Sequence, residues 1–367
     1  MLLMSTEKQD DMDYSGAQER AHFERIVHAF RSYRGRALKH VKEREEFIQS
    51  LPSHHKKLLN SYKSHLKKQK VCIQHNAEII NQIITGVESM FENVQHEPLN
   101  EAGQDLSTLD LDVEKVKSTI RQIVRDWSPI GEKERSLCYG PIIEQIVQLY
   151  PPDRLDASSI NILVPGTGLG RLAHEIARRG YSCQGNEFSL FMLMASNFIL
   201  NKCRGPNSLR VYPWVHTGSN QLTNENQLQE ATFPDQDPSE LPPQAQFTIA
   251  AGDFLEIYTV ANSWDCVATS FFIDCANNIV GFIETIYKIL KPGGYWVNLG
   301  PLLYHFEEQP EEPSIELSYE EVRNIVEGIG FEITVEKTSL ETTYTQNVNS
   351  LMQYGYRSIF FVAKKPL

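Results

Sequence analysis

Apolar residues recur at helical spacing through residues 18–91. The members of this pattern include Phe23, Ile26, Val27, Phe30, Ile79, Ile80, Ile83, Ile84, Val87 and Phe91. Because residues three and four apart share one face of a helix, the spacing predicts several amphipathic helices. Pro52 interrupts them, and Ser53 after it is a suitable N-cap for the next helix. We therefore predict a helical region over residues 18–110, with a disordered tail over residues 1–17 before it.

Two further helical patterns follow, and then the pattern changes. Short apolar runs containing β-branched residues predict strands at residues 161–164, 181–186, 247–251, 264–270 and 295–299. Helical stretches are interspersed with them at residues 171–179, 190–201 and 279–290. This alternation indicates an α/β fold with a doubly wound, mainly parallel sheet, which we assign to residues 111–367.

Two late strands and two polar segments complete the plan. Residues 332–336 and 358–363 have strand character with no helical pattern between them, which suits an antiparallel edge. The polar, proline-rich segment 204–246 is predicted as an insertion over the edge of the sheet rather than core. The segment 93–109 mixes Glu, Pro, Gly, Asp and Ser, so we expect a loop near the domain boundary.

Charge is distributed unevenly along the chain. The sequence has 35 Lys and Arg against 47 Asp and Glu, a net charge of −12. This argues against a general nucleic-acid-binding protein, because such binding neutralises phosphates with basic side chains. Residues 31–70 hold 12 basic and 3 acidic residues, so they carry +9 and the rest of the chain about −21. We interpret the basic segment as two solvated helical faces and expect neither nucleic acid nor membrane as a partner.

The remaining composition indicates a reducing compartment inside the cell. No apolar run reaches the length of about 18 residues that a membrane span needs, and residues 1–14 do not resemble a secretion signal. The six cysteines are scattered without a C-x-x-C pair, which is typical of a reducing compartment. We expect a cytosolic protein, with the nucleus as a second location, and no metal ion.

A glycine-rich turn joins the strand at residues 161–164 to the helix at residues 171–179. Its glycines are Gly166, Gly168 and Gly170. Glycine lets the backbone approach a ligand, and a helix start offers free N–H groups, so the turn suits a nucleotide-like cofactor. A dehydrogenase, another nucleotide-binding protein and a class I methyltransferase would each have such a turn, and so would a turn with no ligand.

Acidic residues after the later strands narrow this choice. Glu187 ends the second strand, 21 residues after Gly166, where a carboxylate can bind ribose hydroxyls; an acidic helix N-cap is the structural alternative. Asp253 and Phe254 follow the third strand, where they could contact an adenine amino group and the base. The Lys-Pro-Gly-Gly turn at residues 291–294 is common in class I methyltransferases. Together these features favour S-adenosylmethionine over NAD.

With these features the sequence resembles the carnosine N-methyltransferases of the N2227-like group. The resemblance rests on the motifs at residues 125–127, 164–172, 183–187, 212–214, 251–254, 271–274 and 298–306. It runs from about Ala21 to the C-terminus and is most specific from Arg121 onwards. It implies an S-adenosylmethionine-dependent transfer of methyl to an imidazole nitrogen of carnosine (β-alanyl-histidine), giving anserine, with other short histidine peptides as further substrates. It also implies a homodimer, which the N-terminal helices could build.

The resemblance further implies the residues that bind the cofactor. These are Gln122, Arg125, Gly166, Gly168, Glu187, Asp253, Phe254 and Ser270. Arg125 has independent support, because a guanidinium can bind the methionine carboxylate of the cofactor, although an ion pair with a neighbour is an alternative. The family has alanine and cysteine where this chain has Thr167 and Ser270, so we expect a backbone contact at Ser270.

The implied substrate-binding residues are Asp274, His305, Tyr344, Tyr354 and Tyr356. Methyl transfer from a sulfonium is an in-line displacement in which positioning dominates. A neutral imidazole needs no strong base, but its non-reacting nitrogen must carry the proton. We expect Asp274, at the end of the fourth strand, to accept that N–H, and His305 to be the second catalytic residue. The alternatives are a helix N-cap for Asp274, a core position for His305 and ordinary strand packing for the tyrosines.

Two other functions stay open from the sequence alone. The first is a class I methyltransferase that acts on protein histidines or another nucleophile. The second is a non-catalytic adaptor whose basic helices bind a partner and whose cofactor fold is vestigial. The intact glycine turn and its acidic residues argue against the adaptor.

Overall fold

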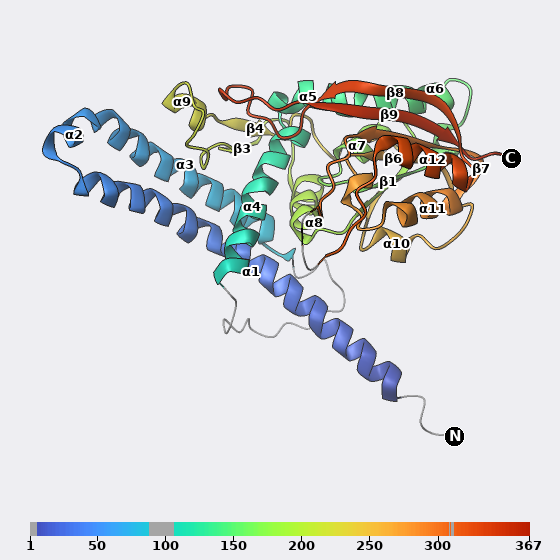
Figure 1. Ribbon diagram of the computed structural model, residues 1–367, viewed down its shortest axis with the longest axis horizontal. Coiled ribbons are helices and arrows are strands. Elements are labelled where there is room, and N and C mark those ends of the chain that lie inside the picture. The colour runs from blue at the N-terminus through green and yellow to red at the C-terminus, as the bar shows by residue number, and fades with distance from the viewer. Residues whose placement is uncertain (1–5, 88–105, 308, 310–311) are drawn as a thin grey trace. The chain divides into compact units, whose positions relative to one another are not determined.

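The computed structural model describes residues 6–87, 106–307, 309 and 312–367, with only the backbone described at residues 6–17 and 106–107 (Figure 1). Part of the predicted N-terminal tail lies outside the described residues, and helix α1 begins at Thr6. The predicted loop near the domain boundary also lies mostly outside them, with helix α4 beginning at Leu106. The chain forms two compact units, one mainly helical and one α/β.

The helical unit is built on a pair of long helices, α1 (Thr6–Ser50) and α3 (Asn60–Ile84), which pack side by side. The short helix α2 (Ser53–Leu58) joins them after the break at Pro52. The apolar residues that the helical spacing singled out are buried here, including Ile26, Val27, Phe30, Ile79, Ile80 and Ile83. The first part of α4 (Leu106–Trp127) belongs to the same unit.

The proline-rich insertion differs from its prediction. Residues 210–231 belong to the helical unit rather than to the edge of the sheet. Asn76 of α3 donates to the Tyr212 carbonyl at 2.9 Å and accepts from the Tyr212 N–H at 2.8 Å. Trp214 and Val215 are buried, so the segment has core residues of its own. The prediction was wrong for residues 210–231, because the few apolar residues there are diluted by polar ones along the chain.

The α/β unit is organised on one seven-stranded sheet in the order β5-β2-β1-β6-β7-β9-β8. Its strands are β1 (Asn161–Pro165), β2 (Ser182–Glu187), β5 (Phe247–Ala251), β6 (Trp264–Ser270), β7 (Leu290–Gly300), β8 (Glu332–Thr342) and β9 (Tyr356–Lys364). The first five in spatial order are parallel, and β9 and β8 add an antiparallel edge. The predicted doubly wound α/β fold is confirmed. A separate two-stranded sheet pairs β3 (Leu209–Val211) with β4 (Ala231–Phe233).

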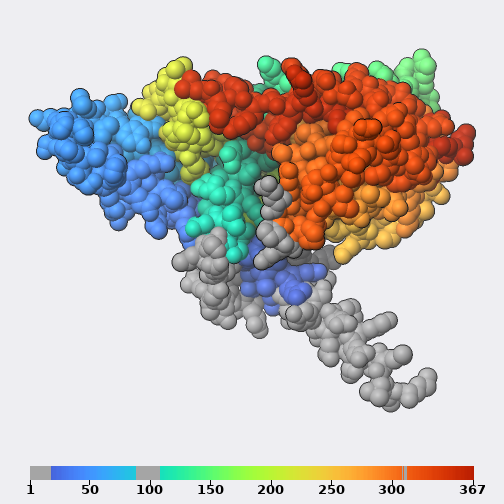
Figure 2. Space-filling model, in the orientation of Figure 1, coloured from blue at the N-terminus to red at the C-terminus, as the bar shows by residue number. Residues whose placement is uncertain are grey.

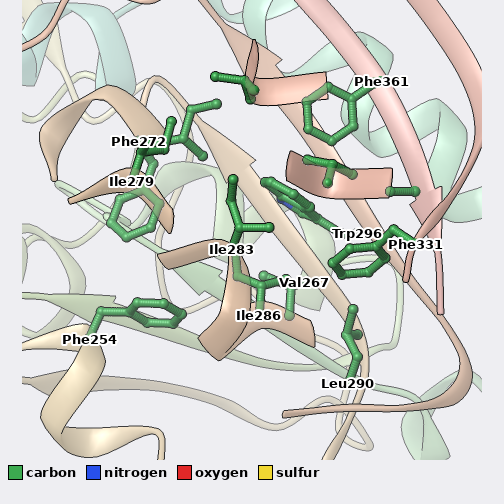
Figure 3. Packing of buried hydrophobic residues seen from close by; sticks show 14 of the residues in the cluster. Phe254, Val267, Phe272, Ile279, Ile283, Ile286, Leu290, Trp296, Phe331 and Phe361 are labelled. Carbon is green, nitrogen blue, oxygen red and sulfur yellow. The ribbon is translucent and has the colours of Figure 1, made fainter. Parts of the chain in front are cut away.

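Helices cover both faces of the large sheet. They are α5 (Glu132–Cys138), α6 (Gly140–Leu149), α7 (Arg171–Ala177), α8 (Leu190–Asn197), α10 (Phe254–Ile257), α11 (Ile279–Ile289) and α12 (Tyr319–Ile329). One core joins α11 and α12 to the sheet around Trp296 and Phe361. Figure 3 shows the α11 residues Ile279, Ile283 and Ile286 beside these two rings. The other core joins α6 and α7 to the opposite face around Ile142 and Leu172. In Figure 2 the last part of the chain, coloured red, reaches the surface, and most side chains of β8 are exposed.

Two local details of this unit depart from the sequence-based plan. Residues 291–294 lie inside β7 as an irregularity in its pairing with β6, not before the strand. Gly294 permits this because a Cβ there would lie 2.8 Å from the Asp265 carbonyl oxygen. Helix α12, capped by Ser318 and Glu321, was not predicted. Among the described residues, no helix is both long enough and apolar enough to cross a membrane.

Candidate functional site

The glycine turn after β1 requires its glycines. Gly166, Gly168 and Gly170 have φ angles of 63°, 56° and 81°, in the left-handed region that other residues rarely adopt. A Cβ on Gly166 would also lie 2.5 Å from the Phe272 ring, too close for any side chain. The turn is therefore fixed both by its backbone conformation and by the aromatic ring beside it.

Glu187 ends β2 and holds this turn in place. Its Oε2 accepts a hydrogen bond from the Gly168 N–H at 2.8 Å. Its Oε1 accepts from the N–H groups of Phe188 and Ser189, at 2.9 and 2.8 Å, just before α8. Burial raises the pKa of Glu187, and these three N–H groups oppose that rise. Ser189 is the N-cap residue of α8 and no side chain caps that helix, so the N-cap alternative for Glu187 is wrong. The ribose contact stays a prediction.

Asp253 and Phe254 lie after β5 in different surroundings. The Asp253 carboxylate accepts from the Leu255 N–H at 2.7 Å and so caps α10. The Phe254 ring is buried in an aromatic cluster, 5.6 Å from the Phe272 centroid and 5.4 Å from that of Phe282. Figure 3 shows Phe254 and Phe272 in this core. The same Phe272 ring thus contacts both Phe254 and the position of Gly166.

Arg125, near the end of α4, is enclosed by aromatic rings and carboxylates. Its Cζ lies 4.9 Å from the ring centroid of Tyr139 and 4.5 Å from that of Tyr344. Its Nη1 donates to the Tyr139 hydroxyl at 2.6 Å, and that hydroxyl donates to Asp126 at 2.8 Å. Its Nε lies 2.9 Å from Glu134 Oε1. The predicted alternative, an ion pair with a neighbour, is present. The predicted contact with a cofactor carboxylate also has support, because Nη2 is buried without a partner.

Gln122 lies on α4 one turn before Arg125. Its side-chain amide donates a short hydrogen bond to the Tyr344 hydroxyl. Tyr344 is carried by the loop between β8 and β9. The structure therefore brings two predicted cofactor residues and one predicted substrate residue together.

Phe271 was not predicted as a site residue. It follows Ser270 at the end of β6 with a φ of 54°, unusual for an aromatic residue. Its backbone passes so close to Gly300 that a Cβ there would lie 3.0 Å from the Phe271 nitrogen. The bend directs the Phe271 ring to within 5.1 Å of the Tyr344 centroid and 5.7 Å of Arg125 Cζ. The Ser270 hydroxyl is buried without a partner.

Asp274 lies in a short 3-10 turn, Ile273–Cys275, after β6. Its Oδ2 accepts from the Leu303 N–H at 2.9 Å, and its Oδ1 is buried without a partner. Burial raises the pKa of Asp274, an effect that the Leu303 hydrogen bond and His305 oppose. Asn278, not Asp274, caps the following helix α11, so the N-cap alternative is excluded.

His305 and the remaining tyrosines lie at the border of this region. The His305 ring is exposed, with Nε2 3.7 Å from the Cys275 sulfur. The backbone N–H of His305 donates to the Asp274 carbonyl. The core alternative for His305 is therefore wrong. Tyr356 is half-buried with its ring 5.9 Å from that of Phe271. Tyr354 is 62% exposed and its hydroxyl donates to the Met352 sulfur, so among the described residues no hydrogen bond or ring contact joins it to the other site residues.

Sequence reasoning missed three residues that build the site around Arg125. Asp126, Glu134 and Tyr139 are all buried and all contact the guanidinium. Asp126 lies in the motif at residues 125–127, one of those on which the resemblance rests, so the sequence did offer a signal for it. Glu134 and Tyr139 had none, because their roles depend on how α5 and the Tyr139 turn pack against α4.

Comparison with known proteins is consistent along most of the chain. A family model for carnosine N-methyltransferase matches residues 103–367. The carnosine N-methyltransferase of Mus musculus is 50% identical over 349 residues, covering 95% of this chain and 87% of that protein. The carnosine N-methyltransferase unmet of Drosophila melanogaster is 44% identical, covering 95% and 80%. The carnosine N-methyltransferase of Schizosaccharomyces pombe is 37% identical, covering 92% and 94%.

Solved structures give a weaker likeness. Phosphoethanolamine N-methyltransferase 2 of Haemonchus contortus in complex with S-adenosyl-L-methionine is 17% identical with a TM-score of 0.41, covering 74% of this chain and 62% of that chain. A likeness this slight carries no argument. The family is shown instead by the family model and by the relatives above, all of them carnosine N-methyltransferases. This chain, an S-adenosylmethionine-dependent enzyme with a class I methyltransferase fold, belongs to the carnosine N-methyltransferase family.

Proposed function

We propose that this enzyme methylates an imidazole nitrogen of carnosine to give anserine, and that it accepts other short histidine peptides. The observation that carries the proposal is the buried, unpartnered Oδ1 of Asp274 at the carboxyl end of β6. A buried carboxylate oxygen without a donor is unfavourable unless a ligand supplies one. An imidazole N–H is a donor of the right kind. The names of the close relatives give the dipeptide.

The residues around the glycine turn fit the cofactor. Arg125 keeps one buried guanidinium nitrogen free, which suits a carboxylate such as that of the methionine part. The glycine turn leaves room beside Gly168, where a Cβ would meet nothing nearer than Asp126 Oδ2 at 4.0 Å. Gln122, Glu187, Asp253, Phe254 and Ser270 are proposed as further cofactor contacts. When bound, S-adenosylmethionine supplies an electrophilic methyl group on a sulfonium.

Asp274 is proposed to select the tautomer of the substrate. Leu303 fixes one carboxylate oxygen by its N–H, so the other points in a single direction. By accepting the N–H of the non-reacting nitrogen, Oδ1 would leave the lone pair on the nitrogen that attacks. The same carboxylate would stabilise the positive charge that develops on the ring as the methyl group is transferred. Because Asp274 is shielded from water, this electrostatic effect is stronger than it would be at the surface.

His305 and the tyrosines are proposed to bind the rest of the dipeptide. His305 is tied to Asp274 through the backbone, and its exposed ring can hydrogen-bond a peptide or terminal group. Tyr344 and Tyr356 both contact Phe271, so together they would form an aromatic wall. Tyr354 belongs to this wall only if the loop moves on binding.

A substrate panel tests the proposal. The enzyme is incubated with S-adenosylmethionine and, separately, with carnosine, other histidine dipeptides, free histidine and a histidine-containing protein. Methylated carnosine, with smaller yields from the other dipeptides, is the expected result. Methylation of the protein alone would instead favour the alternative of a protein histidine methyltransferase.

The assembly and the location of the enzyme are also proposals. We propose a homodimer built by the N-terminal helices, located in the cytosol and also in the nucleus. Light scattering of the full chain and of a chain lacking residues 1–110 tests the first point. The truncated chain should lose the dimer mass, and a truncated dimer would contradict the role of these helices.

A further inference from the structure

A single buried carboxylate, that of Glu134 in α5, holds the loop between β8 and β9. Its Oε1 accepts a hydrogen bond from the Thr345 N–H at 2.9 Å. Its Oε2 accepts from the Thr343 hydroxyl at 3.1 Å and from the Gln346 N–H at 3.3 Å. Three donors of one short loop therefore converge on one side chain.

The same carboxylate contacts Arg125. Glu134 Oε1 lies 2.9 Å from Arg125 Nε, an ion pair without the alignment of a hydrogen bond. The loop that Glu134 holds carries Tyr344, whose ring lies over the Arg125 guanidinium and whose hydroxyl accepts from Gln122. Glu134 thus fixes both the guanidinium and the ring that covers it.

The backbone of this loop needs such support. Thr345 has a φ of 48°, and a β-branched residue in the left-handed region is strained. Strain of this kind persists only where the surroundings impose it. The Thr345 N–H is one of the donors that Glu134 accepts. The loop conformation therefore depends on Glu134 more than on the preferences of the loop sequence.

We propose that Glu134 is a positioning residue for the methionine end of the cofactor. It holds the loop at residues 343–346 against Arg125, so that Tyr344 closes over the guanidinium that receives the cofactor carboxylate. It acts through Arg125 and Tyr344 and does not itself touch the substrate. This inference rests on one part of the proposed function, namely that the methionine carboxylate of the cofactor binds Arg125.

The test compares Glu134→Gln with Glu132→Gln, a matched change at an exposed position of the same helix. Glutamine keeps the size of the side chain but loses its charge and one of its two acceptor oxygens. The Kd for S-adenosylhomocysteine, measured by calorimetry, should rise about tenfold in Glu134→Gln, the equivalent of one hydrogen bond to a charged group. The amides of residues 343–346 should exchange faster, and KM for the cofactor should rise more than kcat falls. Glu132→Gln should behave as wild type.

An unchanged Kd for S-adenosylhomocysteine in Glu134→Gln would overturn the inference, whether or not the amides of residues 343–346 exchange faster. If that variant does not fold, Thr343→Val removes one of the three donors without burying an unpaired group, and it should shift Kd and exchange in the same direction by a smaller factor. A parallel Arg125→Lys variant separates the two proposals. Wild-type affinity in Arg125→Lys contradicts the placing of the cofactor, whereas weak binding there with normal binding in Glu134→Gln contradicts only the role of Glu134.

Discussion

Asp274 accepts a hydrogen bond from the Leu303 N–H through Oδ2, at 2.9 Å, while its Oδ1 is buried without a partner. Leu303 follows β7 and Asp274 follows β6, so two neighbouring parallel strands aim one free acceptor at the edge where ligands bind in doubly wound folds. This pairing is the structural basis for the proposed tautomer selection.

The first prediction concerns Asp274→Asn. The new amide oxygen can still accept from Leu303, which places the NH₂ group where Oδ1 was. The NH₂ group is a donor and so cannot accept a hydrogen bond from the N–H of the substrate imidazole. We expect kcat/KM for carnosine to fall by about 100-fold or more, with the Kd for S-adenosylhomocysteine unchanged. Activity within a few-fold of wild type would show that Asp274 does not have this role.

The second prediction concerns Arg125→Lys. Lysine keeps the charge but lacks both the free Nη2 donor of the guanidinium and the planar group that lies over the Tyr344 ring. The Kd for S-adenosylhomocysteine should rise at least about tenfold, because one charged hydrogen bond is lost. Arg154→Lys, on an exposed side chain, is the control and should bind as wild type. Equal affinity in the two variants would place the cofactor carboxylate elsewhere.

The third prediction compares two glycine substitutions. Gly166→Ala introduces a Cβ at a φ of 63° and 2.5 Å from the Phe272 ring. It should lower the free energy of unfolding by about 1–3 kcal/mol and weaken cofactor binding. Gly35→Ala, within helix α1 with nothing inside 4 Å, should instead stabilise by up to about 1 kcal/mol. Melting temperatures of both variants check this, and equal shifts would contradict the strained turn.

The fourth prediction concerns pH. His174 is fully buried, between Trp127 and Phe247, and burial lowers its pKa to about 4. The unfolded chain has a histidine of ordinary pKa, near 6.5, so between these values the unfolded state binds more protons. Stability is therefore complete above pH 6.5 and is lost as the pH falls toward 4, by up to about 3 kcal/mol from this residue.

Replacing the histidine checks that prediction. Between pH 7.5 and pH 5, the melting temperature of His174→Phe should fall by less than that of the wild type. This holds even if the variant is less stable than the wild type at pH 7.5. His54→Phe, at an exposed position, should keep the wild-type difference. If His174→Phe also keeps that difference, then other groups cause the loss of stability in acid.

Much of the fold could be predicted from the sequence because buried parallel strands are short apolar runs and a glycine turn has few alternatives. Glu187 and Asp274 could be placed because Glu187 ends such a strand and Asp274 lies in the short turn after another. The buried residues Trp214 and Val215 could not, since they lie in a polar segment and pack within the helical unit. The core of that segment is defined by its contacts with α3, which no local pattern encodes.

The support around Arg125 was also invisible to sequence patterns. Glu134 lies 9 residues after Arg125 along the chain but about 210 residues before the loop donors that it accepts. Phe271 has no sequence signal for its positive φ, which depends on the absence of a side chain at Gly300 on the neighbouring strand. Both features arise from packing between distant segments, which single-sequence reasoning does not reach.

The most direct test of the proposed reaction is to identify the product made from carnosine. The wild-type enzyme is incubated with carnosine and S-adenosylmethionine, and the methyl group is located by NMR against an authentic anserine standard. We predict a methyl group on the imidazole ring and a spectrum identical to that of anserine. A methyl group on the β-alanyl amine, or no methylated dipeptide from enzyme that still binds S-adenosylhomocysteine, would contradict it.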